Sequence, residues 1–305
     1  MGDRPRVPVE TTGTMFPILE AQWLSAHIRR LVVSAPRVAR RHQPGHFVIV
    51  RVGDDGERIP LTVADSDPEE GTITLIVQVV GATTEQLCGL QAGQCVHDVA
   101  GPLGRPTHIA KFGHVVLVGG GVGTAVICPQ AGALKRTGNR VTAVIGARRK
   151  DYVIMEKELR AVCDAVYPCT DDGSYGYHGF VTGKLAELID NPSDPVNAVL
   201  TAGPVPMMKA VAEVTRPKGI HTIASLNPIM VDGTGMCGGC RVTIGGKAMF
   251  ACVDGPEFDA HEVDFDGLVD RLTAYLKQEK AAWDRLRRAP DHPCKLIAAQ
   301  THETG

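Results

Sequence analysis

The sequence predicts three parts in order: an antiparallel β-barrel domain, a parallel-sheet α/β domain and a small cysteine-rich segment. Short runs rich in β-branched residues, separated by turn residues, fill the first hundred residues, as in small barrels. Unbroken apolar strands then alternate with helix-length stretches, which is typical of a parallel sheet covered on both faces. Three of the nine cysteines gather late in the chain, at positions 237, 240 and 252.

The barrel is expected over residues 15–108. Its strands are predicted at residues 28–34, 47–52, 59–64 and 72–80, with turns at Pro44-Gly45, Asp54-Asp55-Gly56 and Asp67-Pro68. Glycine, proline and aspartate favour turns because they supply unusual backbone angles or local hydrogen bonds. Residues 101–104, Gly-Pro-Leu-Gly, predict a linker turn that closes the domain. Residues 1–14 lack an apolar core of the kind found in secretion signals and predict a disordered leader, or an upstream start before a true beginning at Met15.

The α/β domain is expected over residues 109–225. An apolar run at 115–118 meets a glycine cluster, a helix-length stretch to Arg136 and a second apolar run at 141–145, which together predict a strand, helix, strand unit. Further helices are predicted at 157–165, 182–189 and 206–215, and further strands at 165–170 and 198–202. Residues 226–262 form the cysteine-rich segment. Residues 263–305 predict an amphipathic helix, at 267–287, and a polar tail.

Composition excludes several classes of function. Lysine and arginine number 32 against 34 aspartates and glutamates, which gives a net charge of −2 and no field that would gather nucleic acid. No apolar run reaches the ~18 to 20 residues that a membrane span needs. The cysteines are odd in number and mostly scattered, which favours a reducing cytoplasm with one metal site over a disulfide framework.

The cysteine motif carries the sharpest chemical signal. Its spacing is Asp232-x4-Cys237-x2-Cys240-x11-Cys252. Thiolates on either side of Gly238-Gly239 can converge on one metal, and the glycines let backbone N–H groups turn toward sulfur. The opening matches plant-type ferredoxins, although the first position is Asp and the last cysteine lies closer. The pattern favours an iron–sulfur cluster; a structural zinc site and inert cysteines are the alternatives.

Two further motifs are weaker. Residues 118–124, Val-Gly-Gly-Gly-Val-Gly-Thr, end an apolar strand and open a helix, where a pyrophosphate can approach the helix N-terminus. The GxGxxG pattern fails at Thr124, so a plain strand-to-helix turn is an equal alternative. Residues 58–62, Arg-Ile-Pro-Leu-Thr, and residues 81–84, Gly-Ala-Thr-Thr, offer groups that hydrogen-bond to phosphate, although an arginine on a strand usually faces solvent.

The order of these pieces resembles the ferredoxin–NADP reductase superfamily over about residues 15–285. Within it, the chain is similar to the electron-transfer subunits of class B dihydroorotate dehydrogenases. It is more similar to the small subunits of NADH-dependent ferredoxin:NADP oxidoreductases, also called the alpha subunits of sulfide dehydrogenases. Asp232 carries this distinction, because the dihydroorotate branch normally has Cys at that position.

The resemblance implies three cofactor sites. FAD would be held by Arg58, Pro60, Leu61, Thr62, Gln78, Thr83 and Thr84. The nicotinamide dinucleotide would be framed by Gly119, Gly121, Gly123, Thr124, Asp171, Asp172, Gly203 and Pro204. A [2Fe–2S] cluster would be bound by Asp232, Cys237, Cys240 and Cys252. Two positions depart from the pattern, because many relatives carry Tyr at position 60 and Cys at position 202, where this chain has Pro and Ala.

The implied activity is transfer of hydride from NADH to FAD, followed by single-electron transfer to the cluster and to a partner. No catalytic acid or base is expected. The expected partner is a larger flavin and iron–sulfur subunit that resembles the glutamate synthase small subunit, with ferredoxin reached through it. The alternatives are an electron-transfer subunit for dihydroorotate oxidation and a redox-inactive, zinc-bearing binding module. The acidic pair at 171–172 favours NADH over NADPH.

Overall fold

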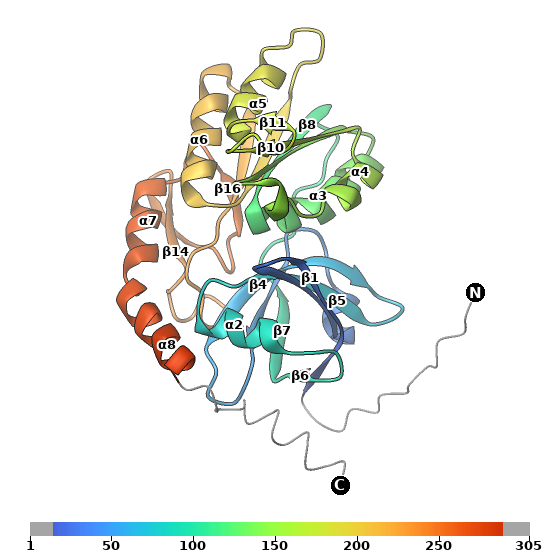
Figure 1. Cartoon of the computed structure of the whole chain (residues 1–305). Coiled ribbons are helices and arrows are strands. Elements are labelled where there is room, and N and C mark those ends of the chain that lie inside the picture. Colours follow the sequence, from blue (N-terminus) through green and yellow to red (C-terminus); the bar gives the residue numbers. More distant parts are fainter. Residues whose placement is uncertain (1–14, 289–305) are drawn as a thin grey trace, which may run out of the picture.

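The computed structural model describes residues 15–288, which form two seven-stranded sheets and a separate two-stranded hairpin (Figure 1). The predicted leader, residues 1–14, and the tail beyond residue 288 lie outside the described residues. Within that described part, no helix combines the length and apolar character that crossing a membrane requires.

The first sheet is antiparallel and curled, which confirms the predicted barrel. Its strands lie in the order β6-β1-β2-β5-β4-β3-β7. Their bounds are β1 Phe16–Ser25, β2 Ile28–Ser34, β3 Phe47–Arg51, β4 Arg58–Asp67, β5 Thr72–Gln78, β6 Cys95–Val96 and β7 Asp98–Leu103. The inner faces of the strands meet in a core that includes Leu31, Ile73 and Leu75, none of which has exposed surface. Two helices, α1 (Pro36–Ala39) and α2 (Ala82–Gly89), complete this part.

Three predictions for the barrel are incomplete or wrong. Strand β1 was not among the expected runs, because its exposed and buried residues do not alternate cleanly. The turn expected at 81–84 continues into helix α2, since the Thr84 hydroxyl accepts a hydrogen bond from Gly81 N and caps the first turn. The linker turn expected at 101–104 lies mostly within β7, which pairs with β3 and tolerates Pro102 because it is an edge strand.

The second sheet is parallel except at one edge, as predicted. Its order is β11-β10-β9-β8-β12-β13-β16, and only β16 is antiparallel to its neighbour. The bounds are β8 His114–Gly120, β9 Arg140–Ala147, β10 Ala165–Thr170, β11 Tyr177–His178, β12 Ala198–Ala202, β13 His221–Ser225 and β16 Glu257–Asp259. The strand order reverses direction between β8 and β12, and ligands of open α/β sheets bind outside the carboxyl ends of strands at such a point.

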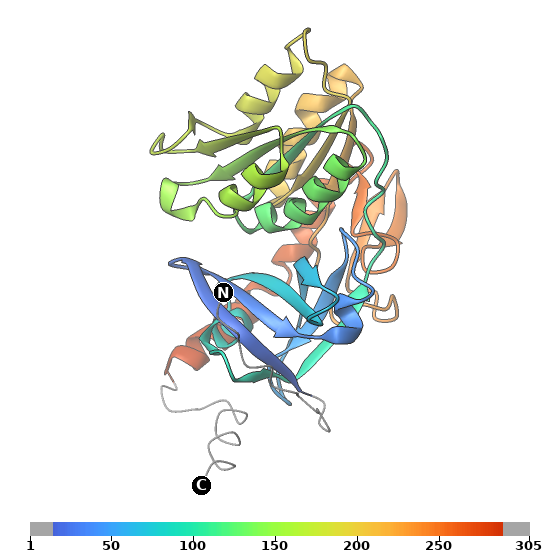
Figure 2. The same ribbon diagram turned by 90° about the vertical axis from the view of Figure 1, so that its right-hand side faces the viewer.

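Helices cover both faces of this sheet. The bounds are α3 Thr124–Arg136, α4 Glu156–Val162, α5 Val181–Ile189 and α6 Val205–Thr215, with 3₁₀ turns at Gly121–Gly123, Lys150–Tyr152 and Arg216–Lys218. Helix α3 lies between the sheet and the barrel, where Ala125 packs with Ile28, Ala64 and Ile76 of the barrel (Figure 2). The helix expected to run to residue 165 ends at Val162, because Cys163 already has an extended backbone.

The C-terminal segment joins the two larger parts. Strands β14 (Arg241–Ile244) and β15 (Lys247–Phe250) form a hairpin, whose two-residue turn has the positive φ angles that Gly245 and Gly246 allow. One apolar cluster unites this segment with Phe47 and Ile49 of the barrel and with Met208 of α6. Figure 1 shows the segment running down the side of both sheets.

The single helix predicted at 267–287 is wrong. The chain forms two helices, α7 (Phe265–Thr273) and α8 (Leu276–Arg288), with a break at residues 274–275. The break serves two different surfaces: α7 buries Phe265 and Leu268 in the C-terminal cluster, whereas on α8 the Trp283 indole N–H donates to Glu85 of α2.

Candidate cofactor and metal site

The β14–β15 hairpin brings two cysteines of the motif together. Cys240 directly precedes β14, and one residue separates the end of β15 from Cys252. The two cysteines therefore lie at the open end of the hairpin. Their Sγ atoms are 3.2 Å apart and both residues are buried. This distance is well above the ~2.05 Å of a disulfide bond. Two thiolates ~2.3 Å from one tetrahedral metal would lie about 3.8 Å apart, so the pair fits one metal atom after a small adjustment.

Asp232 and Cys237 form a second pair, in which Asp232 is half-buried and Cys237 is exposed. The Asp232 carboxylate accepts hydrogen bonds from Thr234 N at 2.8 Å and from Cys237 N at 2.7 Å. These bonds, with that from Thr234 the larger cause, hold the pKa of Asp232 below its usual value. The carboxylate therefore caps the turn in this structure. An ionised carboxylate has about four acceptor positions, so the two bonds leave room for a metal.

Glycines with positive φ shape the loop that carries the motif. Gly238, with φ of 68°, lets the backbone fold so that Gly239 N lies 3.4 Å from Cys237 Sγ. A side chain at Gly233 would place Cβ 2.6 Å from Leu103 Cδ1 and 2.9 Å from Ile49 Cγ1 of the barrel. The loop is thus seated tightly on the barrel and directs N–H groups toward sulfur, as cluster sites require.

The four predicted ligands form two pairs rather than one closed cage. Across residues 15–288, no three His, Cys, Asp or Glu side chains converge as ligands of a single ion. One buried pair and one exposed pair suit a group with two metal atoms better than one tetrahedral zinc. Burial, followed by the neighbouring Cys240, raises the pKa of the Cys252 thiol to about 12, so that thiol keeps its proton until a metal displaces it.

The glycine-rich turn after β8 lies directly against the loop after β12. A Cβ at Gly123 would lie 2.2 Å from the carbonyl oxygen of Ala202, and one at Gly203 would lie 3.0 Å from that of Gly120. The contact therefore excludes any side chain at these positions. Gly121, with φ of 54°, has nothing within 4 Å of its would-be Cβ. An open backbone turn thus lies at the N-terminal end of α3, where N–H groups favour a pyrophosphate.

The acidic loop after β10 lies beside the basic run after β9. Asp172 N donates to the carbonyl of Arg148 at 3.3 Å, and Lys150 N donates to the Ser174 hydroxyl at 2.9 Å. Hydrogen bonds from Ser174 lower the pKa of Asp172, which is exposed. Both sets of charges that could face a ribose or a 2′-phosphate therefore occupy one edge of the sheet.

Arg149 already interacts with two residues of its own loop, the one after β9. Its guanidinium lies 3.8 Å from the Asp151 carboxylate and 5.2 Å from the centre of the Tyr152 ring. Tyr152 in turn stacks on His27 at the tip of the β1–β2 hairpin, with ring centroids 6.2 Å apart. These contacts hold the loop after β9 against the barrel.

The two motifs of the barrel meet at one corner. The Thr83 hydroxyl of α2 donates to the Glu57 carboxylate at 2.7 Å, which brings the start of β4 beside the N-terminus of α2. Arg58, the next residue, is exposed and forms no ion pair within residues 15–288. Val80 is 63% exposed, and nothing lies within 4 Å of a Cβ built on Gly81. The corner therefore offers a cation, open backbone and an apolar surface.

The remaining predicted flavin residues line the adjoining strands. Pro60, Leu61 and Thr62 are half-buried on β4, and Gln78 ends the neighbouring strand β5. The glycine-rich turn reaches the same side of the barrel, because Val122 packs in the cluster that contains Ile28 and Ile76. The nucleotide turn thus packs on the barrel against strands β4 and β5, the strands that carry Pro60, Leu61, Thr62 and Gln78.

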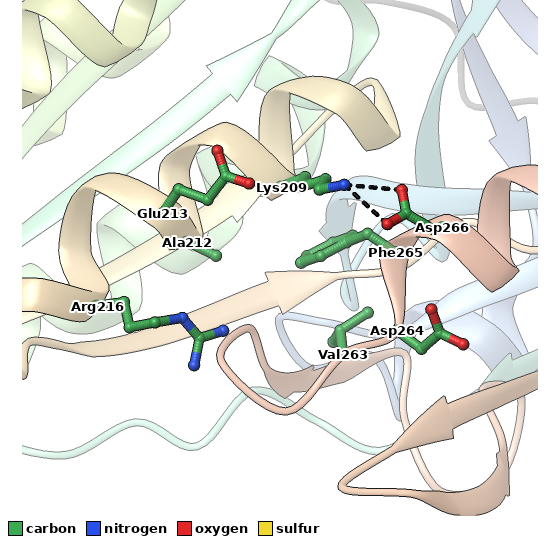
Figure 3. Close-up of a pocket in the computed structure, with 8 residues that line it drawn as sticks. All are labelled: Lys209, Ala212, Glu213, Arg216, Val263, Asp264, Phe265 and Asp266. Atoms are coloured by element: carbon green, nitrogen blue, oxygen red, sulfur yellow. Dashed lines mark hydrogen bonds and ion pairs between the residues drawn. The ribbon is translucent and has the colours of Figure 1, made fainter.

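A pocket between α6 and α7 contains none of the predicted site residues. In its lining, the Lys209 amine donates to the two carboxylate oxygens of Asp266 at 2.7 and 2.9 Å (Figure 3). Arg216, Glu213 and Phe265 also line it. The pocket has no contact with the cysteine loop or the glycine-rich turn, and we assign it no role.

Sequence patterns did not indicate two residues that belong to the site. Glu57 joins β4 to α2, and Arg271 of α7 donates from Nη2 to the Gly239 carbonyl, 3.1 Å away, inside the cysteine motif. Both are single charged residues with no motif around them. The only signal for Arg271 is its position three residues after the buried Leu268, which puts both on one helix face.

Comparison with known proteins agrees with this arrangement. The model of the iron–sulfur cluster binding domain of dihydroorotate dehydrogenase B matches residues 227–264. A homologue of the electron transfer subunit of dihydroorotate dehydrogenase B (NAD⁺) from Thermotoga maritima is 50% identical over 83% of this chain and 89% of its own length. The corresponding subunit from Shouchella clausii is 35% identical over 76% of this chain and 91% of its own.

Solved structures extend the comparison to the fold. The structure of an NADH-dependent reduced ferredoxin–NADP oxidoreductase, studied for flavin-based electron bifurcation, superposes with a TM-score of 0.85 and 44% identity. It covers 90% of this chain and 99% of the matched chain. The Amycolatopsis cytochrome P450 reductase shares the fold at a TM-score of 0.54 and 23% identity, covering 68% of each chain. The chain therefore belongs to the family of dihydroorotate dehydrogenase B electron-transfer subunits and their homologues, within the ferredoxin–NADP reductase superfamily.

Proposed function

We propose that this chain is the electron-transfer subunit of an NADH-dependent oxidoreductase, which accepts hydride from NADH on FAD and passes single electrons through a [2Fe–2S] cluster to a larger subunit. The observation that carries the proposal is that both other parts pack on the barrel: the glycine-rich turn through Val122 against Ile28 and Ile76, and the cysteine segment against Phe47 and Ile49. FAD, when bound, supplies the conversion between two-electron and one-electron chemistry.

The cysteine segment would hold the cluster through two ligand pairs. The distance between the two Sγ atoms supports Cys240 and Cys252 as the ligands of one iron. Asp232 and Cys237, which the bond from Cys237 N to the Asp232 carboxylate holds side by side, would bind the other. Cys237 is exposed whereas Cys240 and Cys252 are buried, so the second iron is the side from which an electron would reach a partner. Gly238 and Gly239 keep the backbone N–H groups beside the sulfurs.

The barrel would hold the flavin at the corner of β4 and α2. Arg58 and the N-terminus of α2 would neutralise the diphosphate, with Thr83 and Thr84 fixing the helix end. Pro60, Leu61, Thr62 and Gln78 would line the strands beneath the flavin. Pro60 removes an N–H and offers a flat apolar surface where many relatives have Tyr, so contact with the ring would rest on shape alone.

The α/β domain would hold the nicotinamide dinucleotide across the β8–β12 switch point. Gly119, Gly121, Gly123 and Thr124 would approach the pyrophosphate, and Gly203 and Pro204 the nicotinamide end. Asp171 and Asp172 would accept hydrogen bonds from ribose hydroxyls. With Ala202 in place of a thiol, the chain would contribute position and exclusion of water to hydride transfer, not an acid or base.

In domain terms, we propose a flavin domain at 15–108, a nucleotide domain at 109–225, a cluster segment at 226–262 and a helical C-terminal part from 263. Strand β16, from the cluster segment, completes the nucleotide-domain sheet.

We further propose that the partner resembles the glutamate synthase small subunit, that ferredoxin is reached through it, and that the complex is cytoplasmic. The NADH-dependent ferredoxin–NADP oxidoreductase structure, which is 44% identical and matched over 99% of its length, supports a partner of this class. Asp232 at the first ligand position points the same way.

The test is to purify the chain from its native host without dissociating its partner. Once the partner has been identified and then separated, the expected result for this chain is a visible spectrum with flavin and iron–sulfur bands, two irons and two acid-labile sulfides per chain, and reduction by NADH. A colourless protein with one zinc would instead establish a binding module. Co-purification of a barrel-type dihydroorotate-oxidising subunit would replace the proposed partner with the alternative one.

A further inference from the structure

Arg271 is a half-buried cation that the proposed function does not use. It lies on α7, one turn after Leu268, which is 2% exposed in the C-terminal cluster. Its Nη2 donates to the carbonyl of Gly239 at 3.1 Å. Its Nε is buried without any hydrogen-bond partner. Within residues 15–288 the guanidinium has no carboxylate partner, so its charge is uncompensated in the protein alone.

A guanidinium whose Nε is buried without a hydrogen-bond partner is costly unless an anion is close to it. The group that the motif would hold supplies that anion. Three thiolates and one carboxylate carry four negative charges, and a two-iron, two-sulfide core carries two positive charges when oxidised, which leaves two negative charges. Uptake of one electron makes the total three, without transfer of any atom. A fixed positive charge nearby therefore favours the reduced state more than the oxidised one.

The bond to Gly239 also places Arg271 where it controls the motif's shape. Gly239 lies between Cys237 and Cys240, and its own N–H is directed toward Cys237 Sγ. Holding its carbonyl toward α7 fixes the peptide planes of the turn, and hence the directions of the two flanking side chains. Gly238 and Gly239 have no side chains that would restrain the backbone. The hydrogen bond from Arg271 to the Gly239 carbonyl therefore restrains the turn from the side of α7.

We propose that Arg271 is a positioning residue of the cluster, which fixes the Cys237–Cys240 turn through the Gly239 carbonyl and presents a half-buried positive charge that raises the cluster's reduction potential. This inference rests on the proposed function, because it assumes that the motif holds an iron–sulfur group. It adds a residue outside the ligand motif and a direction of effect.

The experiment compares Arg271→Gln with Arg271→Lys and with Arg241→Gln. Arg241 is the matched control, since it directly follows Cys240 but is exposed, so solvent screens its charge. The reduction potential is measured by redox titration monitored by electron paramagnetic resonance, with iron and sulfide determined on each sample. For Arg271→Gln we expect the ratio of reduced to oxidised cluster at a fixed potential to fall at least tenfold, which is about 59 mV for one electron.

Arg271→Lys keeps the charge and should stay within threefold of the wild type, and Arg241→Gln within twofold. An unchanged potential in an iron-replete Arg271→Gln protein would overturn the proposal, as would an equal shift in Arg241→Gln. If Arg271→Gln retains no iron, Arg271→Lys decides: full iron at the wild-type potential supports the proposal, and a tenfold shift with the charge retained contradicts it.

A second readout needs no cluster. In chelator-treated protein, hydrogen exchange of the amides of residues 238–241 should be at least tenfold faster in Arg271→Gln than in the wild type or Arg241→Gln. Unchanged exchange would overturn the positioning role. Absence of iron and sulfide from the wild type as purified would contradict the proposed function. The exchange measurement would still test whether the hydrogen bond from Arg271 to the Gly239 carbonyl restrains the turn.

Discussion

Individual residues of the cysteine segment differ in burial, and this difference separates their roles. Cys240 and Cys252 are 1% and 2% exposed, whereas Asp232 is half-buried and Cys237 is exposed. At a buried pair of thiols, no water molecule is available to replace a lost ligand. An exposed pair can exchange a ligand for water at less cost.

Replacing Cys240 with Ser should remove the cluster and leave FAD in place, because the flavin motifs lie in another sheet. Cys237→Ser should also lose iron, although more slowly, since water can reach the exposed pair. Iron, sulfide and flavin are measured after gel filtration. Cys95→Ser, a half-buried barrel cysteine outside the motif, is the control. Unchanged iron in Cys240→Ser would remove that residue from the ligand set.

Asp232 tests whether a carboxylate can both cap the turn and bind iron. Asp232→Cys should retain a cluster with an altered reduction potential, because ligand identity sets the potential. It should also lose the two N–H bonds from Thr234 and Cys237, at a cost of about 1 kcal/mol each. The potential and the electron paramagnetic resonance spectrum are measured; if both match the wild type, Asp232 is a cap and not a ligand.

At the scale of elements, the turn between β8 and α3 depends on a contact with β12. Gly123→Ala would place a methyl group 2.2 Å from a backbone oxygen that cannot move aside. We expect a loss of stability of about 3 kcal/mol and weaker NADH binding. Gly132→Ala, within α3, meets only the end of the Arg136 side chain at 3.3 Å and should be neutral or slightly stabilising. Thermal denaturation of both variants decides; equal melting temperatures would contradict the close packing.

We expect the loops after β9 and β10 to set the choice of nucleotide. Asp171 and Asp172 would repel a 2′-phosphate, and Arg149, the candidate for compensation, is already paired with Asp151 and stacked on Tyr152. We expect kcat/KM for NADH to exceed that for NADPH at least ~10-fold, which corresponds to about 1.4 kcal/mol.

Diaphorase assays with each nucleotide test this preference in the wild type and in Asp171→Ser combined with Asp172→Arg. The double variant should reverse or abolish the preference. Equal kcat/KM values in the wild type would instead assign the 2′-phosphate to Arg148, whose exposed side chain follows β9.

At the scale of the whole molecule, a single carboxyl group lies where all three parts meet. Glu257 of β16 accepts hydrogen bonds from Thr107, in the linker after the barrel, at 2.7 Å, and from Gln130 of α3 at 2.5 Å. Burial raises its pKa from 4.5 to about 7, and the two neutral donors offset this only in part. The folded protein therefore binds this proton more tightly than the unfolded chain.

The sign of the pH dependence follows from that difference. Between pH 4.5 and 7 the folded state holds the proton that the unfolded state releases, so the free energy of unfolding falls as pH rises through this window. The loss is about 3 kcal/mol at most by pH 8. Glu257→Gln stays neutral and should lose this dependence, so it should be more stable than the wild type at pH 8 and similar at pH 5.

Chemical denaturation of both proteins at pH 5 and pH 8 measures this. The difference between variant and wild type removes contributions that they share, such as that of His42, whose pKa burial lowers to about 4. If the difference is the same at both pH values, Glu257 does not titrate in this window.

The sequence alone determined the order of the three parts, the alternation of strands and helices, and the cysteine motif, because each is encoded in local periodicity and spacing. It also indicated the glycine-rich turn, although Gly123 could not be distinguished there from a glycine that merely ends a strand. Glycine is required at position 123 because, in the folded protein, a Cβ there would lie 2.2 Å from the carbonyl oxygen of Ala202, which is 79 positions away in the sequence.

Only the tertiary structure decided which isolated residues belong to the site. The break between α7 and α8 arises from packing on two different surfaces, which a single amphipathic pattern cannot reveal. Arg271 and Glu257 have no motif around them, and their significance comes from burial beside Gly239 and between Thr107 and Gln130. Burial of a charge depends on contacts between distant segments, so no local pattern records it.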